Sequence, residues 1–448
     1  MIPYCDAARC PEAGCLPTVC TGAGVPSNIE MFTRSQLAIP GGVNSSIRAF
    51  KAVGGSPYVV ASGNGCYVTD VEGKQYIDLV QSYGAVILGH AHPSITAAII
   101  AAAADGTSFG APTPREMKLA EAIRERVPSC ERVRLMNSGT EATSTAVRLA
   151  RGMTGRDMIF TFSGNFHGAT DALLVAGGSG IATLGLPGTA GVPNATVANT
   201  MVGPYNVVPT LSEDIAAVIV EPVAANMGLV APAPGFLEGL RAECDRVGAL
   251  LIFDEVITGF RLGSGGAQAK YDIRPDLTCF GKIIGGGLPI GAVGGRADLM
   301  EGLTPIGKVF HAGTLAGNPI ATAAGLAALD ELTGDVYMEL LARARSLSGV
   351  LRDACSAAGL AAQFPVVGTL VGMYFGDGPL PTNFDEAKTT GEASYAALFQ
   401  GALSEGVALA PGAYEAVFVG MGHDDSVIAE IGDRIHAAAV QAVATLGG

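Results

Sequence analysis

The chain of 448 residues carries a formal net charge of −14 at pH 7, and 49% of its residues are hydrophobic. This length and composition predict two or three domain-sized units around a large apolar core. The acidic balance argues against nucleic acid or an anionic membrane surface as a partner. No apolar stretch reaches membrane-spanning length, and the longest, around Ile95–Ala104, predicts an Ala-rich core helix. Since the first residues lack the pattern of a secretion signal, we expect a cytoplasmic protein.

The segment 1–27 is a leader rich in Pro, Gly and Ala, in which four cysteines recur at a regular interval. They are Cys5, Cys10, Cys15 and Cys20. Their spacing differs from the C-x2-C pattern of zinc and redox sites, so we predict a disordered tail, with a metal site as the alternative, and expect no bound metal. The other cysteines are scattered in core-like segments and are expected to be buried thiols. These are Cys66, Cys130, Cys244, Cys279 and Cys355.

The segment 28–85 predicts a short helix, Ile29–Ile39, followed by a small antiparallel sheet. Three short alternating runs form the predicted meander. They are Tyr58–Val60, Cys66–Asp70 and Tyr76–Leu79. His90 and His92 follow, and because no third ligand lies nearby, we expect capping or packing roles for them rather than metal binding.

Between residues 86 and 328, buried-type strands alternate with amphipathic helices, which predicts a mostly parallel sheet with right-handed crossovers. The expected strands are Arg132–Met136, Met158–Phe162, Ala216–Val220 and Ala249–Phe253. The apolar period predicts one helix after residue 142 and another over Pro234–Val247. Gly177–Val192 has no periodicity and predicts a mobile lid. The remainder, 329–448, predicts a smaller α+β unit.

The turn after Arg132–Met136 contains small hydroxyl and glycine residues, Ser138-Gly139-Thr140, directly before a helix. Free amides at a helix N-terminus point at an anion and the helix dipole favours it, so this turn is a candidate phosphate cradle. An ordinary helix N-cap is the alternative.

Two charged residues suggest a cofactor. Asp254 ends an unbroken apolar run, where a strand in an open α/β sheet would present it to a ligand. Lys282 lies in apolar, glycine-rich sequence, where desolvation lowers an amine's pKa and frees a neutral nucleophile. This pair fits pyridoxal phosphate (PLP), whose aldehyde a lysine holds as a Schiff base while a carboxylate keeps the ring nitrogen protonated. A turn-capping aspartate and a surface lysine are the alternative.

Taken in chain order, the 138–140 turn, Asp254 and Lys282 match a known family. From about residue 28 onwards, the sequence resembles the class III aminotransferases of fold type I, and within them the glutamate-1-semialdehyde 2,1-aminomutases. The matching blocks include PGGVNSSIRAF (40–50), NSGTEAT (137–143), EPVAANMG (221–228), FDEVITGFR (253–261), GKIIGGGLPIGA (281–292) and AGTLAGNP (312–319). The resemblance implies an α/β fold: a large PLP-binding domain with a mostly parallel mixed sheet, and a smaller α+β domain.

The resemblance also implies roles for individual residues. Lys282 binds the cofactor and moves protons, Asp254 binds the ring nitrogen, and a further set holds the rest of PLP or its amine form. That set is Ser138, Gly139, Thr140, Phe166, His167, Asn226, Val256 and Thr314, with Thr314 contributed across a homodimer interface. Arg48, Tyr83 and Glu415 are implied to contact the substrate, and Gly177–Pro193 is implied to be a gating loop.

Departures from the family pattern gather near the substrate. They are Tyr83, Phe166, Ala225, His311 and Gly412, where a Trp, Tyr, Gly, Gln and Ser are usual. Because the 177–193 loop and EPVAANMG (221–228) resemble the aminomutases, we expect intramolecular amino transfer from glutamate 1-semialdehyde to 5-aminolevulinate. The departures motivate the alternative, amine transfer between separate molecules. A non-catalytic binding domain is a third hypothesis, which the presence of both Lys282 and Asp254 argues against.

Overall fold

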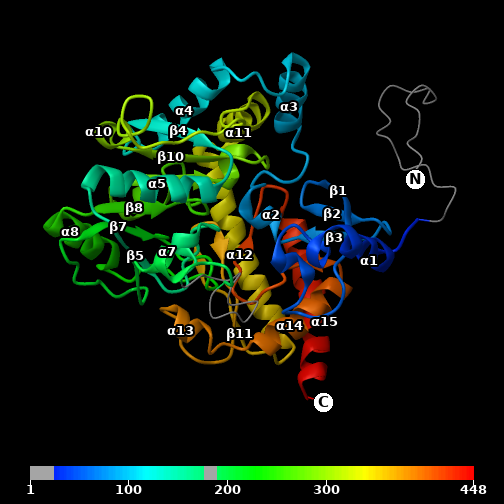
Figure 1. The fold of residues 1–448 in the computed structure, drawn as a ribbon. Coiled ribbons are helices and arrows are strands. Elements are labelled where there is room, and N and C mark those ends of the chain that lie inside the picture. Colours follow the sequence, from blue (N-terminus) through cyan, green and yellow to red (C-terminus); the bar gives the residue numbers. More distant parts are fainter. Residues whose placement is uncertain (1–24, 176–188, 448) are drawn as a thin grey trace.

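The computed structural model describes residues 25–175 and 189–447. The cysteine leader up to residue 24 and most of the expected gating loop, 176–188, lie outside the described residues. The seven-stranded sheet occupies one side of the molecule, the N- and C-terminal segments occupy the other, and the long helix α12 (Gly334–Ala357) runs between them (Figure 1).

The N-terminal segment begins with helix α1 (Asn28–Ala38), as predicted. Ser27 starts it with a capping box, in which its hydroxyl accepts from the backbone of Glu30 and the Glu30 side chain accepts in return. The antiparallel meander follows, but its first strand was placed wrongly. The strands are β1 (Val60–Asn64), β2 (Tyr67–Asp70) and β3 (Gln75–Asp78).

Gly63 and Asn64 are the last two residues of β1. Asn64 pairs with Tyr67, which leaves Gly65 and Cys66 as a two-residue hairpin turn, and Gly65 supplies the positive φ that such turns require.

The large sheet has the strand order β4-β10-β9-β8-β7-β5-β6. Its strands are β4 (Arg132–Met136), β5 (Met158–Phe162), β6 (Thr200–Gly203), β7 (Ile215–Val220), β8 (Leu250–Asp254), β9 (Leu277–Gly281) and β10 (Gly291–Gly295). Strand β10 runs antiparallel to both β4 and β9, while the pairings among β5 to β9 are parallel. The sheet is therefore mixed and mostly parallel, as the resemblance implied.

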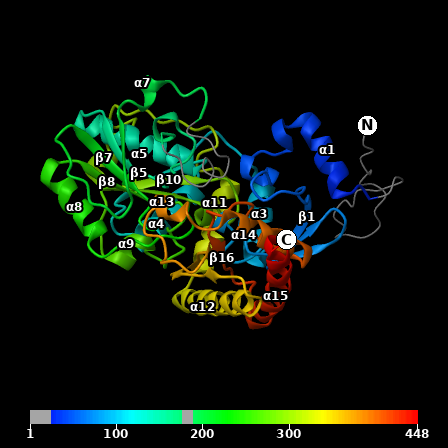
Figure 2. The ribbon, with the colours of Figure 1, turned by 90° about the horizontal axis from the view of Figure 1, so that it is seen from below.

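Both faces of this sheet are buried. Alternate residues of β7 and β8 pack into different clusters: Val218 and Phe253 lie with helix α8 (Phe236–Val247), while Ile219 and Ile252 lie on the side of helix α5 (Gly139–Thr154). This double coverage explains why these strands are continuous apolar runs. Figure 2 shows the helices on either side of the strands.

Helices α3 (Pro93–Asp105), α4 (Pro114–Arg126) and α11 (Pro319–Glu331) pack together at one end of the sheet. The prediction of α3 as a core helix is wrong for a single chain, because only Ile95 and Ala102 of its residues are buried. Pro93 does begin the helix, and the side chain of His92 makes no capping hydrogen bond.

The C-terminal part packs together with the N-terminal meander, and the two share one hydrophobic core. Helices α14 (Glu392–Ser404) and α15 (Asp425–Gly447) pack against each other, α15 also packs against α12, and β15 (Val407–Ala408) pairs in parallel with β3. The remaining strands are β11 (Ala362–Gln363), β12 (Val366–Val367), β13 (Leu370–Val371), β14 (Tyr374–Phe375) and β16 (Val417–Phe418). The short helical turns are α2 (Gln81–Gly84), α7 (Asn194–Val197), α9 (Gly266–Tyr271), α10 (Ala297–Met300), α13 (Phe384–Ala387), η2 (Pro40–Gly42), η3 (Ser46–Ala49), η4 (Asp171–Leu173) and η5 (Lys282–Gly285).

The five cysteines outside the leader are buried free thiols, as predicted, and burial raises the pKa of each. Across residues 25–175 and 189–447, no helix is both long and apolar enough to cross a membrane.

Candidate active site

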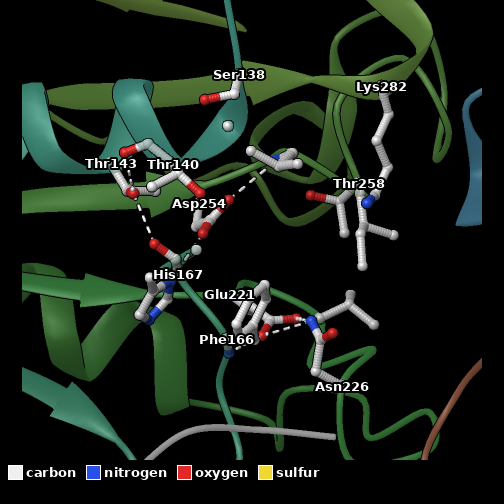
Figure 3. A pocket seen from close by; sticks show the side chains of 15 residues that line it. Ser138, Thr140, Thr143, Phe166, His167, Glu221, Asn226, Asp254, Thr258 and Lys282 are labelled. Atoms are coloured by element: carbon white, nitrogen blue, oxygen red, sulfur yellow. Dashed lines mark hydrogen bonds and ion pairs between the residues drawn. The ribbon is translucent and has the colours of Figure 1, made fainter. Parts of the chain in front are cut away.

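A cavity of about 180 Å³ lies where the strands of the large sheet end. Five strand ends supply charged and polar groups to it: Ser138 follows β4, His167 follows β5, Glu221 follows β7, Asp254 ends β8 and Lys282 follows β9. Figure 3 shows these side chains around the cavity. The carboxyl ends of parallel strands are the usual ligand-binding edge of an open α/β sheet.

The N-terminus of α5 forms one wall. The Ser138 hydroxyl caps the helix by accepting from the Glu141 amide at 3.1 Å, and Gly139 and Thr140 begin the first turn. A Cβ added to Gly139 would lie 3.0 Å from the Val256 side chain, so glycine permits the close approach of the helix to β8. The N-cap and the anion cradle are compatible, because the cap uses the Ser138 hydroxyl and leaves first-turn amides to face the cavity.

Asp254 is buried and its carboxylate is oriented by two donors. One oxygen lies 2.8 Å from Nδ1 of His167, and the other accepts from the Val256 amide at 3.1 Å. Nε2 of His167 in turn lies 3.1 Å from the Thr161 hydroxyl. This chain of contacts fixes the plane of the carboxylate that the sequence placed at the strand end, and Thr161 is a participant that the sequence analysis missed.

Glu221 and Asn226 form a second buried pair in the same cavity. The Asn226 side-chain amide donates to both Glu221 oxygens at 2.9 and 3.0 Å, and the amides of Phe166 and Ala225 also donate to this carboxylate. Figure 3 shows Phe166, Glu221 and Asn226 together on one side of the cavity. The sequence located Glu221 at a strand end but suggested no role, since an acidic residue there carries no sign of its donors.

Lys282 is half-buried and lines the cavity. Lys282 follows β9 with a left-handed backbone (φ 49°), a conformation that non-glycine residues adopt rarely and often at functional sites. Burial lowers the pKa of Lys282, opposed by the negative charges of Glu415, Asp254 and Glu221. The pKa of Lys282 is thus shifted in the direction expected from the sequence, which favours a neutral, nucleophilic amine.

Three residues expected to contact the substrate lie outside the lining of this cavity, and they differ in exposure. Glu415 is buried, Tyr83 is half-buried and Arg48 is exposed. Burial raises the pKa of Tyr83, the negative charge of Glu415 adds to the rise and the positive charge of Arg48 opposes it, so the three groups are within electrostatic range of one another.

Two residues of the loop after β10 also lie away from the cavity lining of this chain. Thr314 is exposed, and the half-buried His311 lines neighbouring surface hollows instead. The structure therefore does not bring Thr314 together with Ser138, Gly139 and Thr140 within one chain.

Glu221 should make stability depend on pH. Burial raises its pKa from 4.5 to about 7, opposed by His167 and reinforced by Asp254. The folded protein then binds this proton more tightly than the unfolded chain, so the stability it contributes is present below pH 4.5 and is lost as pH rises through about 7. Relative to Glu221→Gln, the wild type should lose about 3 kcal/mol across this window. Denaturant unfolding of both cofactor-free proteins at pH 5 and pH 8 measures the difference, and an equal difference at both pH values would contradict the assignment.

Comparison with known proteins agrees with this geometry. The family model described as aminotransferase class-III matches residues 50–417. Two proteins named glutamate-1-semialdehyde 2,1-aminomutase, from Nitratidesulfovibrio vulgaris (strain DSM 19637 / Miyazaki F) and Bordetella avium (strain 197N), are each 50% identical over 420 residues. These alignments cover 92% of this chain and 99% and 98% of the relatives.

Solved structures give the same family. An omega-transaminase from Sphaerobacter thermophilus superposes with a TM-score of 0.84 at 32% identity, covering 93% of this chain and 97% of that one. A glutamate-1-semialdehyde aminomutase from Pseudomonas aeruginosa PAO1, solved as a lysine-to-alanine variant in complex with PMP, has a TM-score of 0.81 at 25% identity and covers 92% and 93%. The chain therefore belongs to the class III aminotransferases, PLP-dependent enzymes of fold type I, as its motifs predicted.

Proposed function

We propose that this enzyme converts glutamate 1-semialdehyde into 5-aminolevulinate, the precursor of tetrapyrroles, by moving the amino group from C2 to C1 of the same molecule. The observation that supports the reaction class is that the Lys282 amine and the Asp254 carboxylate line one cavity. The relatives that carry the aminomutase name, half identical over nearly their whole length, support the substrate.

The residues present fit PLP. The first-turn amides of α5 and the hydroxyls of Ser138 and Thr140 offer donors to a phosphate, and the dipole of α5 favours the negative charge. Phe166 and Val256 line the same cavity and offer apolar surface to the two faces of a planar ring. Asp254, held by His167, is the acceptor for a protonated ring nitrogen.

When bound, PLP supplies an electron sink for the bonds around the amine-bearing carbon. The other steps belong to the chain. Lys282 adds a proton at C1 of the substrate and removes one from C2 as its amine alternates between neutral and charged forms. With the cofactor bound, Asp254 would hold a proton on the ring nitrogen, and Asn226, oriented by Glu221, would lie near the phenolic oxygen. Arg48 meets the substrate carboxylate and Glu415 its amine.

The test is product formation without an amino donor. Purified enzyme loaded with PLP or its amine form should produce 5-aminolevulinate from glutamate 1-semialdehyde alone, measured by colorimetric or mass-spectrometric assay. Absence of product under these conditions would refute the proposal.

A second candidate function is amine transfer between separate molecules, which the changed pocket residues favour, above all Tyr83 and Phe166. Half-reactions with a panel of amines and keto acids, followed by the cofactor spectrum, separate it from the first. Efficient amine exchange with an external donor, without 5-aminolevulinate formation, would establish this alternative.

We further propose that the active unit is a homodimer in which Thr314 reaches the partner's phosphate site. Large apolar side chains are exposed on α3, between α3 and α4, on α4 and in the loop around Thr314. They are Ile100, Phe109, Met117, Phe310 and Leu315. Exposed apolar surface of this kind marks an interaction site, and a second copy would also bury the face of α3. Sedimentation velocity should give twice the chain mass of 45.3 kDa, and a monomeric active enzyme would contradict this.

The five buried free thiols fit a reducing compartment, so we propose a cytoplasmic location. A gating role for Gly177–Pro193 stays a prediction, since 176–188 lie outside the described residues.

A further inference from the structure

The segment that carries Tyr83 has a strained backbone. Gln81, Ser82 and Tyr83 have φ values of 47°, 52° and 55°, and Gly84 follows at 91°. Three consecutive non-glycine residues in the left-handed region form a turn that persists only where its surroundings hold it in place. This turn sets the direction in which Tyr83 leaves the backbone, so whatever holds the turn also positions Tyr83.

The start of the turn is held from the N-terminal side. One oxygen of the buried Asp78 accepts from the Val80 amide at 2.8 Å and the Gln81 amide at 3.1 Å, and its other oxygen lies 2.7 Å from Nε2 of His90. The end of the turn has a different anchor, the side chain of Arg261.

Arg261 bridges the end of this turn and the segment that carries Glu415. One guanidinium nitrogen donates to the Gly84 carbonyl at 2.8 Å, and another donates to the Val419 carbonyl at 2.9 Å. Gly84 directly follows Tyr83, and Val419 directly follows β16, which begins two residues after Glu415. The guanidinium also lies 5.4 Å from the ring of Phe418. The Thr369 hydroxyl donates to the Arg261 carbonyl at 2.8 Å and fixes its backbone.

The charge of Arg261 has no counter-ion among the described residues. The side chain is fully buried, no carboxylate within residues 25–175 and 189–447 forms an ion pair with it, and its Nε has no hydrogen-bond partner there. Burial lowers the pKa of Arg261 to about 9. A buried cation held only by carbonyl groups is a poor source of stability, because apolar residues of similar volume often stabilise such a position better. We therefore infer that Arg261 contributes to function through the two segments that it joins, rather than to stability.

We propose that Arg261 is a positioning residue for the substrate pocket, because it sets the spacing between Tyr83 and Glu415 by joining Gly84 to Val419. It touches neither the cofactor cavity nor the substrate directly, and acts through the two segments that it bonds. The proposal rests on the proposed function only in placing the substrate beside Tyr83 and Glu415.

The test compares Arg261→Met and Arg261→Lys with Arg156→Met as a matched control. Arg156 also bonds two backbone carbonyls, those of Ile215 and Val247, but at the opposite end of the parallel strands. Met removes both bonds of Arg261 at similar volume, whereas Lys keeps the charge and can reach only one carbonyl. We expect KM to rise about tenfold in Arg261→Met and less in Arg261→Lys, with kcat within about twofold of wild type. Arg156→Met should leave KM unchanged.

A second measurement does not depend on activity. Hydrogen exchange at residues 81–86, measured with and without bound PLP, should be faster in both Arg261 variants and unchanged in Arg156→Met. KM is measured with whichever substrate the wild type turns over, in the product assay or in an amine half-reaction. A wild type that makes no 5-aminolevulinate would therefore refute the proposed function and leave this test intact.

The proposal is overturned if KM and exchange at 81–86 both stay at wild-type values in Arg261→Met. If neither Arg261 variant yields folded protein, Thr369→Val replaces them, since it removes only the hydroxyl bond to the Arg261 carbonyl. It should raise KM two- to threefold with faster exchange at 81–86. Unchanged values there would equally overturn the proposal.

Discussion

Replacing Lys282 with alanine should leave a folded protein that binds the cofactor without a covalent bond and turns over at least about 10⁴-fold more slowly than wild type. The reason is the environment of the amine. The half-buried Lys282 lines the same cavity as Asp254, desolvation lowers its pKa, and no other lysine lines the cavity formed by the described residues. No other amine in the described lining could therefore replace it as the nucleophile.

The measurement combines the product assay with the absorption spectrum. The visible band of lysine-bound PLP should be absent in Lys282→Ala, and a solved aminomutase relative that carries a lysine-to-alanine change holds PMP. Lys270→Ala is the matched control, because Lys270 lies on α9 and makes only a cation–π contact with Tyr271. Full turnover in Lys282→Ala would contradict both the site and the reaction class.

Replacing Asp254 with asparagine should slow turnover by about 10²- to 10⁴-fold without unfolding the protein. Removing one member of a buried charged pair costs about 3–5 kcal/mol of interaction free energy. If this interaction is lost in the transition state, turnover falls by a factor in this range. Asparagine fills the same space and can still accept from the Val256 amide, but it carries no charge to keep a proton on a pyridine nitrogen. Cofactor bound to the variant should therefore titrate at lower pH than in wild type, which a spectral pH titration measures.

Asp276→Asn provides the comparison for Asp254→Asn. Asp276 is also buried and charged, but its partners are Arg241 and Arg296, away from the cavity. We expect Asp276→Asn to lower thermal stability while leaving the spectral titration unchanged. If both variants affect the spectrum equally, Asp254 has no special relation to the cofactor.

The parts of the fold that the sequence predicted best are those where burial dominates. Strands β4 and β5 begin and end where they were expected, because strands covered on both faces are continuous apolar runs. Strand β7 begins one residue earlier than expected, and β8 is shifted by one residue at both ends. The same logic placed Asp254 at a strand end facing a ligand. The cofactor and the family followed from motifs that lie at these strand ends.

Strand β10 escaped prediction for a physical reason. Three of its five residues are glycine, which is disfavoured in strands, so no strand pattern is visible. The structure explains the glycines: a Cβ at Gly291 would lie 2.1 Å from the Ser138 carbonyl oxygen, and one at Gly294 would lie 2.5 Å from the Cys130 sulfur. The close packing of β10 thus requires glycines, and the same glycines remove the strand pattern from the sequence.

Contacts between distant segments could not be predicted either. The hydrogen bonds of Thr161, Glu221 and Arg261 depend on side chains brought together from different strand ends, and no periodicity encodes them. Thr314 shows the converse. A motif predicts its role, but the single chain leaves it exposed, and only an assembly of two chains would test it.

The pairing of β3 with β15 has a consequence for synthesis on the ribosome. β3 ends at Asp78, and its parallel neighbour begins only at Val407. Throughout translation of the intervening residues, the nascent meander exposes an open hydrogen-bonding edge and an unfilled apolar face. We therefore expect this half of the protein to acquire its native packing last and to need chaperone protection until the final helices emerge.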